Sequence, residues 1–148
     1  MPHYAENRKA RFNYEFLEKY ETGIELLGTE VKSVRGGQMS LEGAFVIARG
    51  GEAYLINANI PPYQPANAPK DYDPLRNRKL LLTKKEIAEL AGSEKNKSLT
   101  IVPISVYNKG RKIKVEIALS KGKKKFDKRE TLKKRDTDRE IRREYKDR

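Results

Sequence analysis

Two runs in which apolar residues recur at every second position constrain the fold of this chain more than any other feature. Every second residue is apolar or threonine in both runs, which comprise Thr100, Val102, Ile104 and Val106, and then Ile113, Val115, Ile117 and Leu119. A period of two predicts strands with one buried face, and the intervening Asn108-Lys109-Gly110 is a turn signal. The sequence therefore predicts an antiparallel hairpin, with these cations near its tip and on its polar face: Lys109, Arg111, Lys112 and Lys114.

Earlier segments carry the same strand signals. From Phe12 to Leu26 the apolar residues fall on even positions, which predicts one strand or two consecutive strands. Residues 44–49 and 53–57 are rich in aliphatic side chains and flank Gly50-Gly51, which predicts a second hairpin. Five or six short strands in a stretch of about 110 residues predict a mainly β fold, an antiparallel barrel of the oligonucleotide-binding (OB) type with two or three short helices.

Helices and a long loop are expected between the strands. Residues 29–37 combine a helical spacing of two valines with two closing glycines, which predicts a short helix. Thr83-Lys84-Lys85-Glu86 matches a capping box, so we expect a helix that ends at Gly92. Five prolines between residues 59 and 79 predict a long irregular connection.

Positive charge is concentrated near the C-terminus. The 148 residues carry a formal charge of +12, of which residues 121–148 contribute +7 and residues 1–120 only +5. The C-terminal segment has few sizeable apolar side chains to offset the ordering entropy of its backbone: Phe126, Leu132, Ile141 and Tyr145. We therefore expect a folded barrel of residues 1–120 and a basic tail of residues 121–148 that is disordered when free.

Composition excludes several classes of protein. The chain has no Cys and one His, His3, so it offers no thiolate zinc site, no disulfide framework, no cysteine nucleophile and no Ser-His-Asp triad. The sequence contains no apolar run of the roughly 18–20 residues that cross a bilayer, and no secretory signal pattern. We expect a cytoplasmic protein without a cofactor or metal, not an enzyme, whose partner is a polyanion.

A cationic group adjoins the proline-rich loop. Arg76, Arg78 and Lys79 lie within four residues and form either an ordinary charged strand end or a phosphate clamp, since Arg presents a planar fork to two oxygens. Tyr63 and Tyr72 in the loop favour the clamp, because unpaired RNA bases stack on aromatic rings while phosphates pair with cations.

Glu30 is the single acid of the segment Gly28-Thr29-Glu30-Val31-Lys32-Ser33. One interpretation is a tight turn into a helix, with Glu30 at the positive end of the helix dipole. In the other interpretation Glu30 accepts hydrogen bonds from a base edge, because a carboxylate repels phosphates and would serve recognition rather than attraction. The residues alone leave both interpretations open.

The tail has a basic run followed by a helical stripe. Residues 121–129 hold six cations around the aromatic Phe126. From about Glu130 the sequence favours helix, and four cations at i, i+4, i+7 and i+11 would share one face: Arg135, Arg139, Arg142 and Lys146. Such a stripe is either a solvated face or a helix that gains its stability from an external anion such as RNA phosphate.

Four motifs of the chain closely resemble the SmpB family, the bacterial proteins that bind transfer-messenger RNA (tmRNA, or SsrA RNA). They occur in order along essentially the whole chain: residues 7–11 (NRKAR), 28–33 (GTEVKS), 73–82 (DPLRNRKLLL), and 121–125 (KGKKK) followed by 127–130 (DKRE). The resemblance implies an OB-type barrel with peripheral helices and a C-terminal tail.

The resemblance also implies a function in trans-translation, which rescues ribosomes stalled on messages that lack a stop codon. The barrel is expected to bind the tRNA-like domain of tmRNA, and elongation factor Tu is expected in the complex that delivers this RNA to the ribosome. The tail is expected to enter the vacant mRNA channel past the decoding centre, to contact ribosomal RNA there and to become helical.

Carried over position by position, the resemblance implies two sets of binding residues. The set expected to bind tmRNA comprises Glu30, Val31, Lys32, Asn57, Ile60, Tyr63, Arg76, Arg78, Lys79, Lys123, Lys124 and Lys125. The set in the tail expected to bind the ribosome comprises Phe126, Asp127, Lys128, Arg129, Lys133, Lys134, Arg135, Arg139, Arg142 and Lys146. Many relatives carry His where this chain has Phe12, Tyr72 and Thr83, so no role for an imidazole carries over.

Two functions of other classes remain as alternatives. One is a structural component of the ribosome that binds ribosomal RNA through its basic surface. The other is an RNA-processing enzyme that would hold Mg²⁺ through Asp71 and Asp73.

Overall fold

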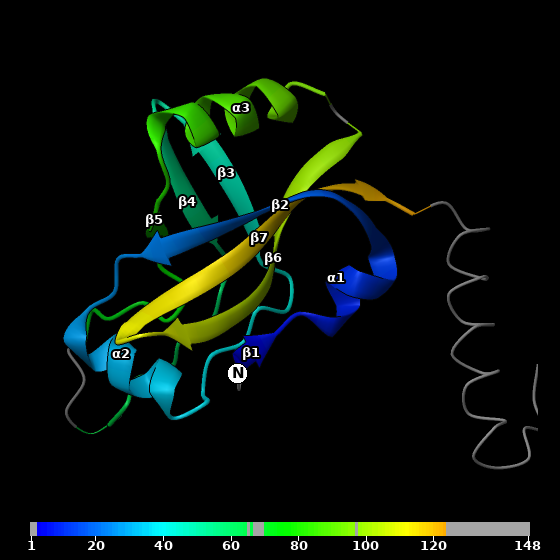
Figure 1. The fold of residues 1–148 in the computed structure, drawn as a ribbon. Helices are drawn as coiled ribbons and strands as arrows, with labels where there is room; N and C mark the ends of the chain where they lie inside the picture. The colour runs from blue at the N-terminus through cyan, green and yellow to red at the C-terminus, as the bar shows by residue number, and fades with distance from the viewer. Residues whose placement is uncertain (1–2, 65, 67–69, 97, 124–148) are drawn as a thin grey trace, which may run out of the picture.

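The described part of the chain contains seven strands and three helices (Figure 1). The computed structural model describes residues 3–64, 66, 70–96 and 98–123. The helices are α1 (Arg8–Asn13), α2 (Gly28–Arg35) and α3 (Lys84–Glu94). The strands are β1 (His3–Glu6), β2 (Tyr14–Ile24), β3 (Phe45–Arg49), β4 (Glu52–Ile56), β5 (Arg78–Leu81), β6 (Leu99–Lys109) and β7 (Lys112–Gly122).

The strands form one antiparallel sheet that closes into a ring. In the order β6-β3-β4-β5-β2-β7 each strand pairs with the next, and β7 pairs back with β6, while β1 lies outside the ring on β6. Two junctions of the ring are short. β3 meets β6 at Val46 and Ile101, and β2 meets β5 at Gly23–Leu81 and Ile24–Leu80. The predicted mainly β class and OB-type barrel are confirmed.

Both predicted hairpins are present. β6 and β7 pair from Leu99–Lys121 to Lys109–Lys112 and turn at Gly110, whose φ is 64°. β3 and β4 pair from Phe45–Ile56 to Arg49–Glu52 and turn at Gly50 and Gly51, whose φ values are 61° and 75°. Two successive positive φ angles match the twist of the flanking strands, and glycine adopts them without steric cost.

The N-terminal end differs from the prediction. The alternation from Phe12 predicts a strand, and this prediction is wrong at its first residues: Phe12 lies in α1, and β2 begins at Tyr14. The cause is Asn7, which is 6% exposed. Its Oδ1 accepts from the Ala10 amide at 3.1 Å and its Nδ2 donates to the Pro103 carbonyl at 3.0 Å. A six-residue helix held by a distant strand leaves no periodic signal of its own.

The two predicted helices are present, one with a corrected end. Thr83 caps α3 as expected, because its hydroxyl accepts from the Glu86 amide at 3.2 Å and the Glu86 carboxylate accepts from the Thr83 amide at 3.0 Å. The predicted end at Gly92 is wrong, since α3 continues to Glu94. The Glu94 carboxylate accepts from the Ala48 amide at 3.0 Å and so ties the last turn to β3.

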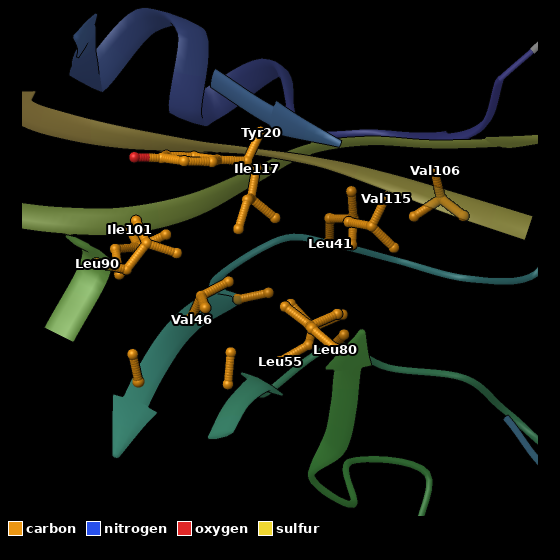
Figure 2. Packing of buried hydrophobic residues seen from close by; sticks show 14 of the residues in the cluster. Tyr20, Leu41, Val46, Leu55, Leu80, Leu90, Ile101, Val106, Val115 and Ile117 are labelled. Carbon is orange, nitrogen blue, oxygen red and sulfur yellow. The ribbon is translucent and has the colours of Figure 1, made fainter. Parts of the chain in front are cut away.

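Inward-facing side chains from every strand of the ring form one core (Figure 2). They include Tyr20 of β2, Val46 of β3, Leu55 of β4, Leu80 of β5, Ile101 of β6 and Ile117 of β7. α3 lies over one end of the barrel and contributes Leu90, while α2 lies at the opposite end and contributes Val34 (Figure 1). Each end of the barrel therefore carries a different helix, and the candidate site lies at the end that carries α2.

The described chain ends just past β7. This strand pairs with β2 as far as Gly122 and Tyr14, two residues beyond the predicted end of the barrel at residue 120. The predicted tail from Lys124 onward, with all its candidate ribosome-binding residues and the candidates Lys124 and Lys125, lies outside the described residues. Among the helices that the structure describes, none has both the length and the apolar character needed to cross a membrane.

Candidate nucleic-acid interface

Glu30 occupies the first turn of α2 and is 1% exposed. Its Oε1 accepts from the backbone amide of Leu27, the residue before the helix, at 2.8 Å. This bond satisfies one of the amides that a helix start leaves without a partner, and it places the negative charge at the positive end of the helix dipole. The first interpretation, in which Glu30 lies at the positive end of the helix dipole, is therefore confirmed.

Two arginines converge on the same carboxylate. The Nε and Nη2 atoms of Arg76 donate to Glu30 Oε2 and Oε1 at 3.0 and 2.5 Å. The Nε and Nη2 atoms of Arg78, at the start of β5, donate to Glu30 Oε2 at 3.0 and 2.6 Å. The arginine side chains differ in exposure, since that of Arg76 is 31% exposed and that of Arg78 is 0% exposed.

The buried arginine also holds the proline-rich loop. Arg78 donates through Nη1 to the Ala58 carbonyl at 2.8 Å and through Nη2 to the Pro74 carbonyl at 3.1 Å. The Tyr72 hydroxyl lies 2.7 Å from the Ile60 carbonyl oxygen and 3.1 Å from Glu30 Oε2. We call Glu30, Tyr72, Arg76 and Arg78 the Glu30 cluster; it fastens both ends of the loop to α2.

The cluster keeps Glu30 ionised. Burial alone would raise the pKa of Glu30, but the hydrogen bonds from Arg76, the Leu27 amide and Arg78 outweigh it and lower the pKa to about 2. The hydrogen bond with Glu30 raises the pKa of Arg76. Burial, followed by the charge of Glu30, raises the pKa of Tyr72, so its hydroxyl keeps its proton.

This geometry changes the roles expected for two candidates. Both oxygens of Glu30 already accept hydrogen bonds within the protein, so the carboxylate has no free side to offer a base edge. The Arg78 guanidinium has no exposed surface with which to clamp a phosphate. RNA contact by these residues stays a prediction, and the geometry favours an indirect contribution, in which they position the loop and α2.

Exposed candidates surround the cluster. The Lys32 ammonium lies 5.9 Å from the centroid of the Tyr63 ring, and Tyr63 is 44% exposed. The Lys79 ammonium lies 3.2 Å from a Glu52 oxygen, with 39% of its side chain exposed. Arg76 and Lys79 line an open groove of about 750 Å³, whose other polar lining residues include Tyr54, Asn77 and one acid, Glu25. Cations beside an aromatic ring are the combination that binds unpaired RNA.

The remaining described candidates are arranged less uniformly. Ile60 is fully buried and donates its amide to the Pro74 carbonyl at 3.0 Å, so it is a core residue of the loop. Asn57 is exposed and has a φ of 66° at the end of β4. Val31 is half-buried in α2. Lys123 lies apart, beside α1, where its amide donates to the Asn13 carbonyl at 2.9 Å and its ammonium to the Arg11 carbonyl at 3.3 Å.

Several residues that line this groove are absent from the predicted set of binding residues, and Tyr72 makes a contact that the sequence did not indicate. The acid Glu25 lines the groove together with Leu27, Tyr54 and Asn77. Asn77 lies within the motif of residues 73–82 but was not singled out, and the other three lie in none of the four motifs. Only the position of Leu27, three residues before Glu30, indicates a capping partner. The hydroxyl of Tyr72 belongs to the Glu30 cluster, and stacking of its ring on a base stays a prediction.

The two acids of the enzyme alternative lie in the same loop. The Asp73 carboxylate accepts from the Leu75 amide at 2.9 Å and so forms a turn. Within the described residues there is no group of three His, Asp or Glu side chains suited to hold a metal ion.

Known proteins with similar sequence and fold identify the family. The family model described as "SmpB protein" matches residues 4–147. Relatives described as SsrA-binding proteins include those of Thermosynechococcus vestitus (50% identical, covering 97% of this chain and 95% of the relative), Sulfurihydrogenibium sp. (55%, 96% and 93%) and Mesoplasma florum (54%, 96% and 95%). A solved structure described as "tmRNA-SmpB: a journey to the center of the bacterial ribosome" matches with a TM-score of 0.68 and 44% identity over 86% of this chain and 92% of that chain. The chain belongs to the SmpB family.

Proposed function

We propose that this protein binds tmRNA through its tRNA-like domain and delivers it to ribosomes stalled on messages without a stop codon. The observation that carries the proposal is the match to SsrA-binding proteins at 50–55% identity over 96–97% of the chain. The exposed cations and the aromatic ring around α2 support it, because they form a surface suited to RNA at one end of the barrel.

The Glu30 cluster prepares this surface for binding. Its hydrogen bonds fix the loop that carries Tyr63 and Arg76 before RNA arrives, so less conformational entropy is lost on association. In this proposal the direct contacts come from Lys32, Tyr63, Arg76 and Lys79. Glu30 and Arg78 act as positioning residues.

The tail is proposed to recognise the stalled ribosome. Residues 124–148 carry 12 Lys and Arg against 7 Asp and Glu, and a cationic segment of this kind is attracted to a channel lined by RNA phosphates. It enters the mRNA channel past the decoding centre only when no message fills the channel, so steric exclusion gives selectivity. The protein acts in the cytoplasm, with elongation factor Tu in the delivery complex, and catalyses no reaction itself.

A binding comparison tests the first half of the proposal. Fluorescence anisotropy should show that the full chain binds the tRNA-like domain of tmRNA at least tenfold more tightly than a scrambled RNA of equal length, at moderate salt. Equal affinity for both RNAs would contradict the proposal. The labelled RNA should be recovered intact after incubation with Mg²⁺; cleavage would support the enzyme alternative instead.

Truncation tests the second half. The cut belongs after Lys123, because β7 pairs with β2 up to Gly122 and Lys123 is bonded to α1. The shortened protein should still bind the tRNA-like domain, while tagging of peptides on stalled ribosomes is lost. A control with residues 124–148 replaced by a Gly/Ser segment of equal length separates charge from length. Loss of RNA binding would place the main site in the tail, and stoichiometric association with all ribosomes would favour a structural ribosomal protein.

A further inference from the structure

A second cationic groove lies on another face of α2. It has a volume of about 310 Å³ and separates this helix from the tip of the β6–β7 hairpin. Figure 1 shows α2 beside this tip, at the end of the barrel opposite α3. The predicted set of tmRNA-binding residues includes none of the hairpin cations. No residue of the Glu30 cluster lines this groove, so the proposed function gives the groove no role. We call it the hairpin-tip groove.

The rim of the hairpin-tip groove is positively charged. Arg35, Arg111, Lys112 and Lys114 line it, and no carboxylate is among the described residues that do so. Arg35, the last residue of α2, donates through Nη2 to the Arg111 carbonyl at 3.0 Å and so links the helix to the hairpin. In the described part of the chain none of these four side chains forms an ion pair with an acid.

The acid Glu21 lies near two of the hairpin cations. The hydrogen bond from Tyr107, the hydrogen bond from Lys109 and the charges of Lys109 and Lys114 lower the pKa of Glu21. Glu21 is bonded to Lys109 at 2.9 Å, outside the groove, so it offsets Lys114 in part. Arg111 and Lys112 at the tip are therefore the cations best placed to bind an external anion.

The other side chains that line the groove are apolar, and we call them its floor. They are Ile24, Leu26, Val31, Leu81 and Ile113, and Leu81 is 52% exposed. A bare phosphate needs cations but no apolar floor. A nucleotide needs both, because its base covers apolar surface or stacks on guanidinium planes while its phosphate pairs with cations. The volume is at the lower end of the range for ligand pockets, which fits one nucleotide.

We propose that the hairpin-tip groove binds one unpaired nucleotide of the same RNA that occupies the Lys32–Tyr63 side of α2. The two proposed contact regions lie on neighbouring faces of α2, which supports binding of a single RNA to both. Val31 and Arg35, four residues apart and therefore on one face, line the groove, while Lys32 contacts Tyr63 on a neighbouring face. α2 then lies between two contacts of one RNA. This inference rests on the proposed function, since it extends the binding of the tRNA-like domain.

Charge removal at the tip is the first test. Arg111→Ala with Lys112→Ala should weaken binding of the tRNA-like domain at least tenfold. It should also lower the slope of log affinity against log salt by about 0.7–0.9, which is the value for the one phosphate of the bound nucleotide. Lys84→Ala with Lys85→Ala removes the same charge from exposed positions of α3 at the other end of the barrel, and should weaken binding less than threefold. Equal effects of the two double variants, or no effect at the tip, would overturn the proposal.

A change in the floor distinguishes a nucleotide from a phosphate alone. Leu81→Ala should weaken binding about threefold to tenfold without changing the salt slope, because no charge is removed. Leu17→Ala is the matched control, since Leu17 is also exposed, at 49%, and lies outside the groove. Equal binding by the Leu81 variant and the wild type would reduce the groove to a phosphate contact and overturn the nucleotide assignment.

Direct contact can be mapped because the chain has no cysteine of its own. A single Arg111→Cys substitution carrying an iron chelate should cleave the bound tRNA-like domain at one unpaired segment, whereas the same chelate at Lys85→Cys should not. Diffuse cleavage from position 111 would overturn the proposal. Failure of the wild type to prefer the tRNA-like domain over scrambled RNA would instead contradict the proposed function, so the two failures are distinguishable.

Discussion

At the scale of single residues, the decisive feature is one buried carboxylate shared by two arginines. Removing charges from water is costly, and a buried ion pair is retained only when its geometry and hydrogen bonds are good. Glu30 meets this condition, because Arg76, Arg78, Tyr72 and the Leu27 amide all bond to it. A substitution that leaves the carboxylate or a guanidinium group without its partner costs free energy. We therefore expect even conservative substitutions in the cluster to destabilise the fold.

Glu30→Gln should destabilise the fold and flatten its dependence on acid. The folded-state pKa of Glu30 is lowered from 4.5 to about 2, so the unfolded chain binds more protons between these values. The resulting stability is present above the unfolded pKa and is lost as pH falls through the folded pKa. It amounts to about 3 kcal/mol. Urea denaturation from pH 7 to pH 2 should show this fall in the wild type and a smaller one in the variant; parallel curves would contradict the prediction.

Arg78→Lys should be more harmful to stability than Arg76→Lys. Lysine cannot reproduce the planar fork that reaches Glu30, Ala58 and Pro74 at once, so we expect a loss of about 3 kcal/mol at the buried site. At the partly exposed Arg76 we expect a loss of about 1 kcal/mol. The side chain of Arg78 is fully buried and cannot reach an RNA phosphate. Its substitution should therefore leave the slope of log affinity against log salt unchanged in the folded protein. Equal losses of stability in urea titrations would show that burial does not separate the two arginines.

At the scale of helices and strands, neighbouring residues in the sequence predicted the turns and the helix start that are held by local contacts. The Gly50-Gly51 turn, the Gly110 turn and the start of α3 at Thr83 were all predicted from neighbouring residues, and each is held by contacts within a few positions. α1 was missed because its cap, Asn7, is anchored to the carbonyl of Pro103.

The same distinction applies to the candidate site. The motifs led to Glu30, Arg76 and Arg78, but they could not reveal that the carboxylate and one guanidinium are buried against each other. Burial depends on how α2 and β5 meet in the folded barrel, 48 residues apart in the chain for Glu30 and Arg78. A run of cations in a sequence is the same whether its members face solvent or a buried acid.

Thr83→Ala tests the local part of this argument. The Thr83 hydroxyl accepts from the Glu86 amide at the start of α3, and loss of such a cap costs about 1 kcal/mol. Chemical denaturation should therefore show that decrease in the free energy of unfolding. Lys85→Ala, at an exposed position of the same helix, should change it by less than about 0.5 kcal/mol. A Thr83 variant as stable as the Lys85 variant would mean that packing of α3 alone determines where the helix starts.

At the scale of the whole molecule, the barrel consists of two halves joined by two short seams. One half contains the long strands β2, β6 and β7, and the other contains β3, β4 and β5. The seams are the Val46–Ile101 pairing and the two pairs between β2 and β5. The Glu30 cluster bridges the second seam, because α2 follows β2 and Arg78 begins β5. The Glu30 cluster, which in the proposed function prepares the RNA surface, therefore also links the two halves of the barrel.

Native-state hydrogen exchange should separate these halves. Few backbone hydrogen bonds cross the two seams, so little has to break for one half to separate from the other. We therefore expect the amides of β3, β4 and β5 to open together, at a free energy at least about 1 kcal/mol below that of β6 and β7. Glu30→Gln should lower the opening free energy of the β3–β5 half more than that of the other half, since it weakens the bridge between them. A uniform decrease across all strands would mean that the barrel opens only as one unit and that the cluster contributes to global stability without acting at the seam.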